Sequence, residues 1–208
     1  MSRLLLALPL FAAIAGAQDV VREQRIGSPW PAVTIVTYVD ATPEEAAAVF
    51  IDYARHVEFI PSTKLSRVSR VHSPADVEVD YIVALPVVSD EKYTVRDKVS
   101  RDSTGYRVDW TLVRASSTKA TVGHARFTAA THPKTGKPGT RFEYHNFVTP
   151  GSRLAGLGFI KNRALKEMEQ TAAAFAKRFE SEKRNSAAMQ SRIATLRAAL
   201  GMSYQAIP

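Results

Sequence analysis

Hydrophobic residues in the last third of the chain recur with the period of one helix face. In residues 154–184 they are separated by three, four or seven positions, whereas charged residues such as Lys161, Lys166 and Glu169 occupy other faces. The recurring residues are Leu154, Leu157, Ala164, Met168, Ala172, Phe175 and Phe179. This pattern predicts a long amphipathic helix that buries one side, with Ser152 capping its first turn.

Upstream of this helix, seven segments rich in β-branched and aromatic residues are typical of strands. They span residues 33–39, 65–72, 77–85, 92–102, 106–114, 118–130 and 140–149. Only short breaks separate the last six, which predicts a meander of antiparallel strands. Alternation within residues 92–102 places Tyr93, Val95, Asp97 and Val99 on one side of the sheet.

Two short helices are predicted between the first strand and the meander. Thr42 can act as an N-cap, Pro43 suits the first helical position, and Glu45 can close a capping box. Residues 46–52 should therefore be helical. A second short helix is expected over residues 53–60, which the following proline stops.

The C-terminal tail, residues 185–208, contains a further amphipathic stretch. Met189, Ile193, Leu196 and Leu200 are spaced by four, three and four positions. The tail can fold back on the body of the protein, pair with another chain or rest on a membrane surface, and the sequence leaves these three options open.

The first seventeen residues have the layout of a cleavable secretory signal peptide. Arg3 gives a positive start, residues 4–14 form an apolar run too short to span a bilayer, and Ala15-Gly16-Ala17 suits cleavage before Gln18. The predicted organisation is a signal peptide (1–17), an N-terminal segment (18–32), one domain (33–184) and the tail. We expect a periplasmic or secreted protein.

The composition excludes cysteine chemistry and gives the mature protein a positive charge. The chain has no Cys, which excludes disulfides, thiol catalysis and lipid attachment at a cysteine. Loss of Arg3 with the leader leaves 27 Lys and Arg against 20 Asp and Glu, a net charge of +7. This charge favours transient contact with an anionic membrane surface rather than nucleic acid, although scattered basic residues also suit a soluble surface.

The order of strand, two short helices, meander and long helix is the helix-grip arrangement, an α+β fold whose curved sheet wraps the last helix around a cavity. Several motifs also resemble the START-like (SRPBCC) superfamily, especially its polyketide cyclase/dehydrase, lipid-transport and coenzyme Q-binding branch. They are Ala41-Thr42-Pro43-Glu44-Glu45, Val49-Phe50-x-Asp52-Tyr53, Glu58-Phe59-Ile60-Pro61, Gly123 ahead of Phe127, Thr140-Arg141-Phe142-x-Tyr144, Thr149-Pro150-Gly151 and Phe159-Ile160-Lys161-Asn162-Arg163-Ala164-Leu165. The resemblance covers residues 33–184 and implies a cavity for a hydrophobic ligand.

The inward strand positions and the long helix supply the candidate ligand-binding residues. These are Tyr81, Tyr93, Val95, Asp97, Trp110, Phe127, Tyr144, Asn146, Met168 and Phe175. Asp97 and Asn146 are the two polar residues on otherwise apolar strand faces, where an unpaired group costs free energy. Each can hold a ligand hydroxyl or carbonyl, Asp97 can act as a general base, and Asp97 can instead pair with a neighbouring Tyr or Arg.

The sequence favours the first of three functions and leaves the other two as alternatives. The first is a carrier of a hydrophobic small molecule, in particular a lipid. The second is an aromatase/cyclase-like enzyme that uses Asp97 and nearby tyrosines, and the third is an envelope interaction protein that docks through its tail. The five His residues lack the spacing of metal ligands, no nucleotide or nucleophile motif occurs, and we expect no cofactor. The oligomeric state is not predicted.

Overall fold

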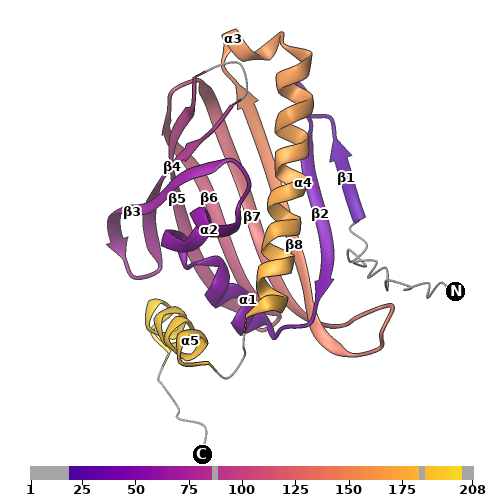
Figure 1. The fold of residues 1–208 in the computed structure, drawn as a ribbon, viewed down its shortest axis with the longest axis vertical. Helices are drawn as coiled ribbons and strands as arrows, with labels where there is room; N and C mark the ends of the chain where they lie inside the picture. Colours follow the sequence, from indigo (N-terminus) through magenta and orange to yellow (C-terminus); the bar gives the residue numbers. More distant parts are fainter. Residues whose placement is uncertain (1–18, 86–88, 183–185, 203–208) are drawn as a thin grey trace, which may run out of the picture.

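The computed structural model describes residues 19–85, 89–182 and 186–202, which form one antiparallel sheet with helices across one face (Figure 1). The sheet has the strand order β1-β2-β8-β7-β6-β5-β4-β3. Its strands are β1 (Asp19–Glu23), β2 (Ala32–Val39), β3 (Thr63–Ser73), β4 (Asp76–Val83), β5 (Glu91–Asp102), β6 (Gly105–Ala115), β7 (Thr118–Thr131) and β8 (Pro138–Pro150). The predicted six-stranded meander is therefore confirmed as β3 to β8, and β2 pairs with β8 to complete the predicted set.

The strand β1, at the edge of the sheet, was not predicted from the sequence. Its sequence, Asp-Val-Val-Arg-Glu, has no alternation, and all five residues are exposed. It is instead held by antiparallel pairing with β2 and by an ion pair between Arg22 and Glu169 of the long helix. Part of the predicted N-terminal segment thus belongs to the sheet.

The predicted capping box at the start of α1 (Pro43–Phe50) is present. The hydroxyl of Thr42 accepts a hydrogen bond from the Glu45 amide at 3.2 Å, and the Thr42 amide donates to the Glu45 carboxylate at 2.8 Å. A short 3₁₀ turn, η1 (Tyr53–Arg55), and α2 (His56–Phe59) form the second predicted helix. Together these elements turn the chain across the open face of the sheet (Figure 1).

The prediction of one continuous helix over residues 154–184 is wrong at its beginning. The structure has a short α3 (Ser152–Ala155) and a long α4 (Gly158–Ser181), separated at residues 156–157. Gly156 and Gly158 each disfavour helix by about 1 kcal/mol relative to Ala. Leu157, predicted on the buried face, is 37% exposed, and Phe159 is 53% exposed, so no packing offsets that cost.

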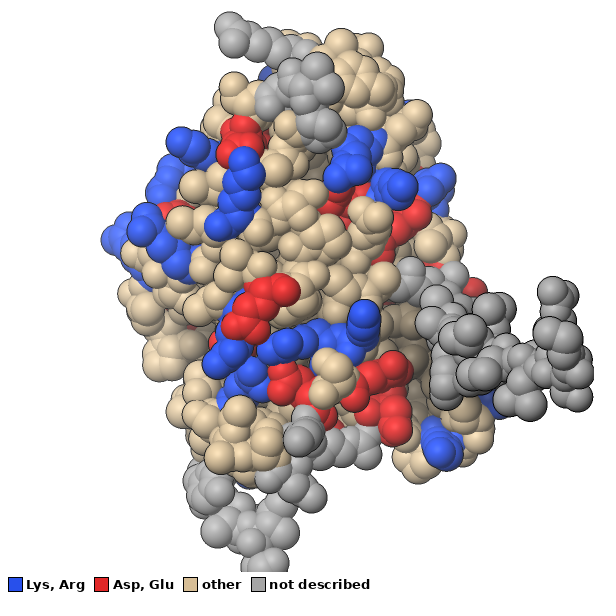
Figure 2. Space-filling view, in the orientation of Figure 1, with Lys and Arg blue, Asp and Glu red and all other residues tan. Residues whose placement is uncertain are grey.

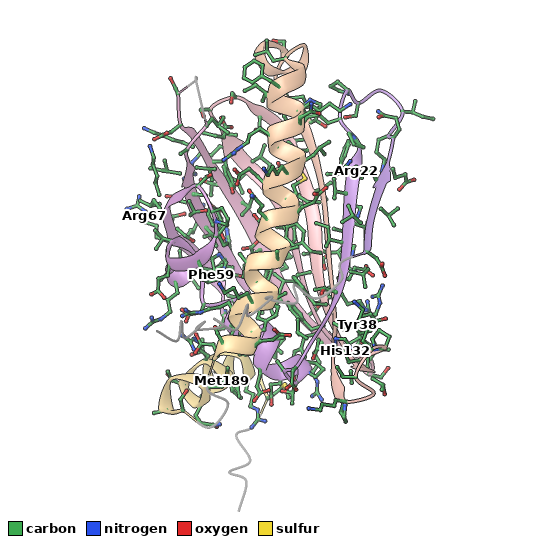
Figure 3. The ribbon with its side chains drawn as sticks, turned by 45° about the vertical axis from the view of Figure 1, so that its right-hand side comes forward. Arg22, Tyr38, Phe59, Arg67, His132 and Met189 are labelled. Atoms are coloured by element: carbon green, nitrogen blue, oxygen red, sulfur yellow. The ribbon has the colours of Figure 1, made fainter. Side chains whose placement is uncertain are left out.

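The tail helix α5 (Ala187–Ala199) folds back on the body of the protein, which is the first of the three options. Met189 and Leu196 are buried, and Figure 3 shows Met189 at the lower end of the molecule. Arg197 forms two hydrogen bonds of 2.7 Å with Glu44 of α1, and Arg192 reaches Asp52 at 2.6 Å. The apolar side of the tail is therefore occupied by its own domain.

Aromatic side chains fill the space between the sheet and the lower half of α4. The Phe50 ring of α1 stacks on Phe175 of α4 with centroids 4.4 Å apart, and Phe142 meets Phe179 edge to face at 5.1 Å. Phe127 is 0% exposed within the same cluster. This cluster of interlocking rings closes the lower end of the helix-grip interior.

Candidate ligand-binding cavity

A cavity of about 240 Å³ lies between the sheet and the first three quarters of α4. Strands β4 to β8 form one wall, and residues 160–175 of α4 form the opposite wall. Phe50 and Phe175 border it on the side of the aromatic cluster, and apolar residues dominate the remaining lining. These include Trp30, Ile60, Val83, Leu85, Val95, Val148, Ile160 and Met168.

Nine of the ten predicted ligand-binding residues line this cavity. They are Tyr81, Tyr93, Val95, Asp97, Trp110, Tyr144, Asn146, Met168 and Phe175. Phe127 does not line it, because its ring packs between Phe50 at 5.5 Å and Phe142 at 5.4 Å in the aromatic cluster. The placement comes from the structure, whereas contact of these nine residues with a ligand remains a prediction.

One row of neighbouring residues across the sheet forms the polar floor of the cavity. Asp97 of β5 pairs with Trp110 of β6, which pairs with Gly123 of β7, which pairs with Asn146 of β8. A Cβ atom on Gly123 would lie 2.5 Å from the Trp110 ring. Because Gly123 has no side chain, the indole crosses it and donates a hydrogen bond to the Asn146 side-chain oxygen at 3.2 Å.

Asp97 is a buried carboxyl group without a full set of partners. It is 3% exposed, and its Oδ1 atom has no hydrogen-bond partner among the described residues. Burial raises the pKa of Asp97 to about 8, while the nearby Tyr53 hydroxyl acts in the opposite direction. The Tyr53 hydroxyl is itself buried, and it interacts with the Asp97 carboxyl without forming a well-aligned hydrogen bond to any described residue. At neutral pH, Asp97 is therefore mainly the uncharged acid.

A histidine missed by the sequence reasoning orients one of the cavity tyrosines. His56 Nε2 lies 2.8 Å from the Phe50 carbonyl oxygen, which can only accept, so this nitrogen carries the proton. His56 Nδ1 then accepts a hydrogen bond from the Tyr81 hydroxyl at 2.9 Å. Burial lowers the pKa of His56 to about 4 and keeps the ring neutral. No local pattern signals this contact, because β4 and α2 meet only in the folded chain.

Glu91, Arg163 and Glu167 of the cavity wall each pair with another protein group, although Arg163 Nε and Glu167 Oε2 have no hydrogen-bond partner among the described residues. The Glu91 carboxylate accepts hydrogen bonds of 3.1 Å from the backbone amides of Ser117 and Thr118. Arg163 and Glu167, one turn apart on α4, form an ion pair. The described residues contain no group of His, Asp or Glu arranged to hold a metal ion, and none of their helices is long and apolar enough to cross a membrane.

Comparison with known proteins finds similarity in structure alone. No profile of a known family matches the sequence, and no curated protein matches it. Among solved structures, a STAR-related lipid transfer protein from Xanthomonas axonopodis is 14% identical and has a TM-score of 0.64, over 78% of this chain and 93% of that protein. The ZhuI aromatase/cyclase from Streptomyces sp. R1128 is 16% identical, with a TM-score of 0.57 over 76% and 96% of the two chains.

A START superfamily protein from Mycobacterium smegmatis extends the comparison, with 15% identity and a TM-score of 0.53 over 72% of this chain and 97% of its own. Each of these three proteins shares its architecture with this chain but has a very different sequence. The likeness therefore concerns the fold, which is compatible with several functions. The resemblance noted in the sequence is confirmed at that level, and the chain has the START-like helix-grip fold.

Proposed function

We propose that the protein is an exported carrier that holds a hydrophobic small molecule, in particular a lipid, between the sheet and α4. The observation that carries this proposal is the cavity of about 240 Å³ with its apolar lining. Burying about 400 Å² of apolar ligand surface contributes on the order of 10 kcal/mol before the costs of association. Such a gain is sufficient for a stable complex with an aliphatic or polycyclic ligand.

Native mass spectrometry of the mature protein, purified from its own cell envelope, tests this proposal. Organic extraction then identifies any molecule that copurifies. A carrier should retain a stoichiometric lipid or take one up from a broad panel. A protein that arrives empty and remains empty with every lipid offered would contradict the carrier proposal.

A matched pair of substitutions on α4 assigns that binding to the cavity. Ala164 lines the cavity, whereas Ala173 of the same helix is exposed. Ala164→Trp should fill the space and reduce ligand uptake at least tenfold, while Ala173→Trp should leave uptake unchanged. Equal uptake by both variants, measured by native mass spectrometry, would place the ligand elsewhere.

Export is the part of the proposal that depends on the leader sequence. Residues 1–17 lie outside the described residues, and the support is their charged start, apolar run and Ala15-Gly16-Ala17 ending. The mature N-terminus of protein recovered from the periplasm or medium should be Gln18. Recovery of the uncleaved chain from the cytoplasm would contradict export.

Contact with an anionic membrane would allow the carrier to exchange its ligand. Leu157 and Phe159 are exposed at the start of α4, next to Ile160 and Arg163 of the cavity wall. Figure 2 shows uncharged residues over the upper middle of this face, with Lys and Arg on both sides. Vesicles containing phosphatidylglycerol should bind the protein, and Phe159→Ser should weaken that binding several-fold.

Enzymatic activity is the second candidate function, because an acid and a hydroxyl group lie together at the cavity. The side chains of Asp97 and Tyr53 line the cavity, and each has a buried oxygen without a hydrogen-bond partner among the described residues. A carboxyl group with a pKa of about 8 can exchange a proton with a substrate near neutral pH. If the protein is an aromatase/cyclase-like enzyme, Asp97→Asn should abolish turnover, whereas in a carrier it should only adjust affinity.

A further inference from the structure

The polar groups on the cavity floor indicate which chemical class of ligand the cavity accepts. Asn146 uses its side-chain oxygen to accept from Trp110, which leaves its amide nitrogen as the donor of that side chain. The Tyr53 hydroxyl and the Asp97 Oδ1 atom lack hydrogen-bond partners among the described residues. The floor therefore combines hydrogen-bonding atoms from η1, β5 and β8.

Within the described lining of the cavity, no unpaired positive charge accompanies these groups, although Arg163 Nε has no hydrogen-bond partner there. Among the described residues that line the cavity, Arg163 is the only cationic side chain, and Glu167 pairs with it. His56 is held neutral between the Phe50 carbonyl and the Tyr81 hydroxyl. A ligand carboxylate or phosphate placed on the floor would thus lose its hydration without meeting a counter-charge, which is strongly unfavourable.

Building on the proposed carrier function, we propose that the cavity selects a ligand with an uncharged hydroxyl or carbonyl group, which Asp97, Tyr53 and Asn146 bind at the floor. The apolar remainder of the ligand lies along the aliphatic wall formed by Val83, Leu85 and Val148. A neutral alcohol, ester or ketone satisfies the unpaired atoms, and a fatty-acid anion does not. Discrimination of this type arises because buried polar atoms that stay unpaired are costly.

The protonation of Asp97 separates the two neutral ligand types. The acid form can donate to a carbonyl oxygen, whereas the carboxylate can only accept. The titratable groups that face Asp97 are Tyr53 of η1, Tyr81 of β4, Tyr93 of β5 and Tyr144 of β8, and burial raises the pKa of each tyrosine. These tyrosines stay neutral while Asp97 ionises. The α4 wall adds only the paired Arg163 and Glu167.

The test uses three ligands with the same ten-carbon chain, decanol, methyl decanoate and decanoate, with the full mature protein. Isothermal titration calorimetry at pH 7 should show decanol and methyl decanoate binding at least tenfold more tightly than decanoate. Raising the pH from 7 to 9 should weaken the binding of methyl decanoate several-fold and leave the affinity for decanol almost unchanged. Asp97→Asn, which keeps an amide donor, should bind methyl decanoate equally at both pH values.

The outcomes distinguish this inference from the carrier proposal on which it rests. Decanoate binding as tightly as the two neutral ligands would overturn the inference and leave the carrier proposal standing. Failure of the protein to bind any of the three would count against both. As a matched control, Asp109→Asn changes an aspartate that pairs with Arg107 and lies outside the cavity lining, and it should retain the tenfold preference and the pH response.

Discussion

The two ends of the space between the sheet and α4 are built differently, although the same strands and the same helix border both. At the lower end, Phe50, Phe127, Phe142 and Phe179 interlock and are each no more than 5% exposed. At the upper end, tyrosines and shorter aliphatic residues border a cavity of about 240 Å³. The contrast shows that one scaffold separates the part that stabilises the fold from the part available for a ligand.

The change from filled to hollow takes place across three consecutive inward rows of the sheet, and the row with Ala125 and Tyr144 is the middle one. The row with Phe127 and Phe142 is filled by rings, whereas the row with Asp97 and Asn146 contains Gly123, which has no side chain. The Trp110 indole lies across that glycine and is tied to Asn146. Three of the four residues in this row are therefore small or polar, and its one large ring lies flat across the glycine, which leaves space that rings occupy in the row with Phe127 and Phe142.

The strongest expected difference between the two ends is in stability. Phe142→Ala should lower the free energy of unfolding by about 4 kcal/mol, because it opens a void within a fully packed cluster. Tyr93→Ala at the hollow end should lower the free energy of unfolding by less than half as much, since the Tyr93 ring already borders the cavity. Denaturant unfolding of both variants measures this difference, and equal losses would contradict the contrast between the two ends.

The tail helix should contribute to the filled end alone. Leu196 is fully buried, so Leu196→Ala should cost about 3 kcal/mol in denaturant unfolding. No described residue of α5 lines the cavity, so binding of decanol should keep its affinity in this variant when measured well below the unfolding transition. A parallel loss of affinity would show that α5 also shapes the hollow end.

A smaller effect should appear in the dependence of stability on pH. Since burial raises the pKa of Asp97 from 3.8 to about 8, the folded state binds its proton more tightly, and stability falls as the pH rises towards 8. Below pH 6.5, His56 acts in the opposite sense, because its pKa is lowered to about 4 and acid favours the unfolded chain. Between pH 6.5 and 8 the free energy of unfolding should therefore fall by about 2 kcal/mol.

The matched variants for this measurement are Asp97→Asn and Asp109→Asn. Asp97→Asn should remove the decrease in stability between pH 6.5 and 8, whereas Asp109→Asn, in contact with Arg107 at the surface, should retain it. Chemical denaturation at several pH values supplies the data. A decrease that persists in Asp97→Asn would assign it to another group.

Local patterns predicted the fold well because alternation and helical period are set by each segment alone. They placed β2 to β8 and the capping box of Thr42 and Glu45. They did not indicate β1, which is held by pairing and by Arg22, or the break before α4, where Leu157 finds no partner. The strand β1 depends on contacts between distant parts of the chain, whereas the break lies at Gly156 and Gly158, whose weak helix propensity the hydrophobic period alone does not register.

The candidate site was predictable to the extent that an inward strand position implies proximity to the cavity. Asp97 and Asn146 were identified because they interrupt apolar faces. The assignment of Phe127 to the lining was wrong, since the limit of the cavity depends on where Phe50 inserts between helix and sheet. The contact of His56 with Tyr81 joins residues 25 positions apart and has no periodic signal.

The position of the indole rings gives the protein a built-in optical reporter. The chain contains two tryptophans, Trp30 and Trp110, and both line the cavity. All indole fluorescence of the protein therefore originates beside the proposed ligand. Displacement of water by a ligand should shift this emission to shorter wavelength, so occupancy can be followed in solution without a label, and Trp30→Phe isolates the signal of the ring that lies across Gly123.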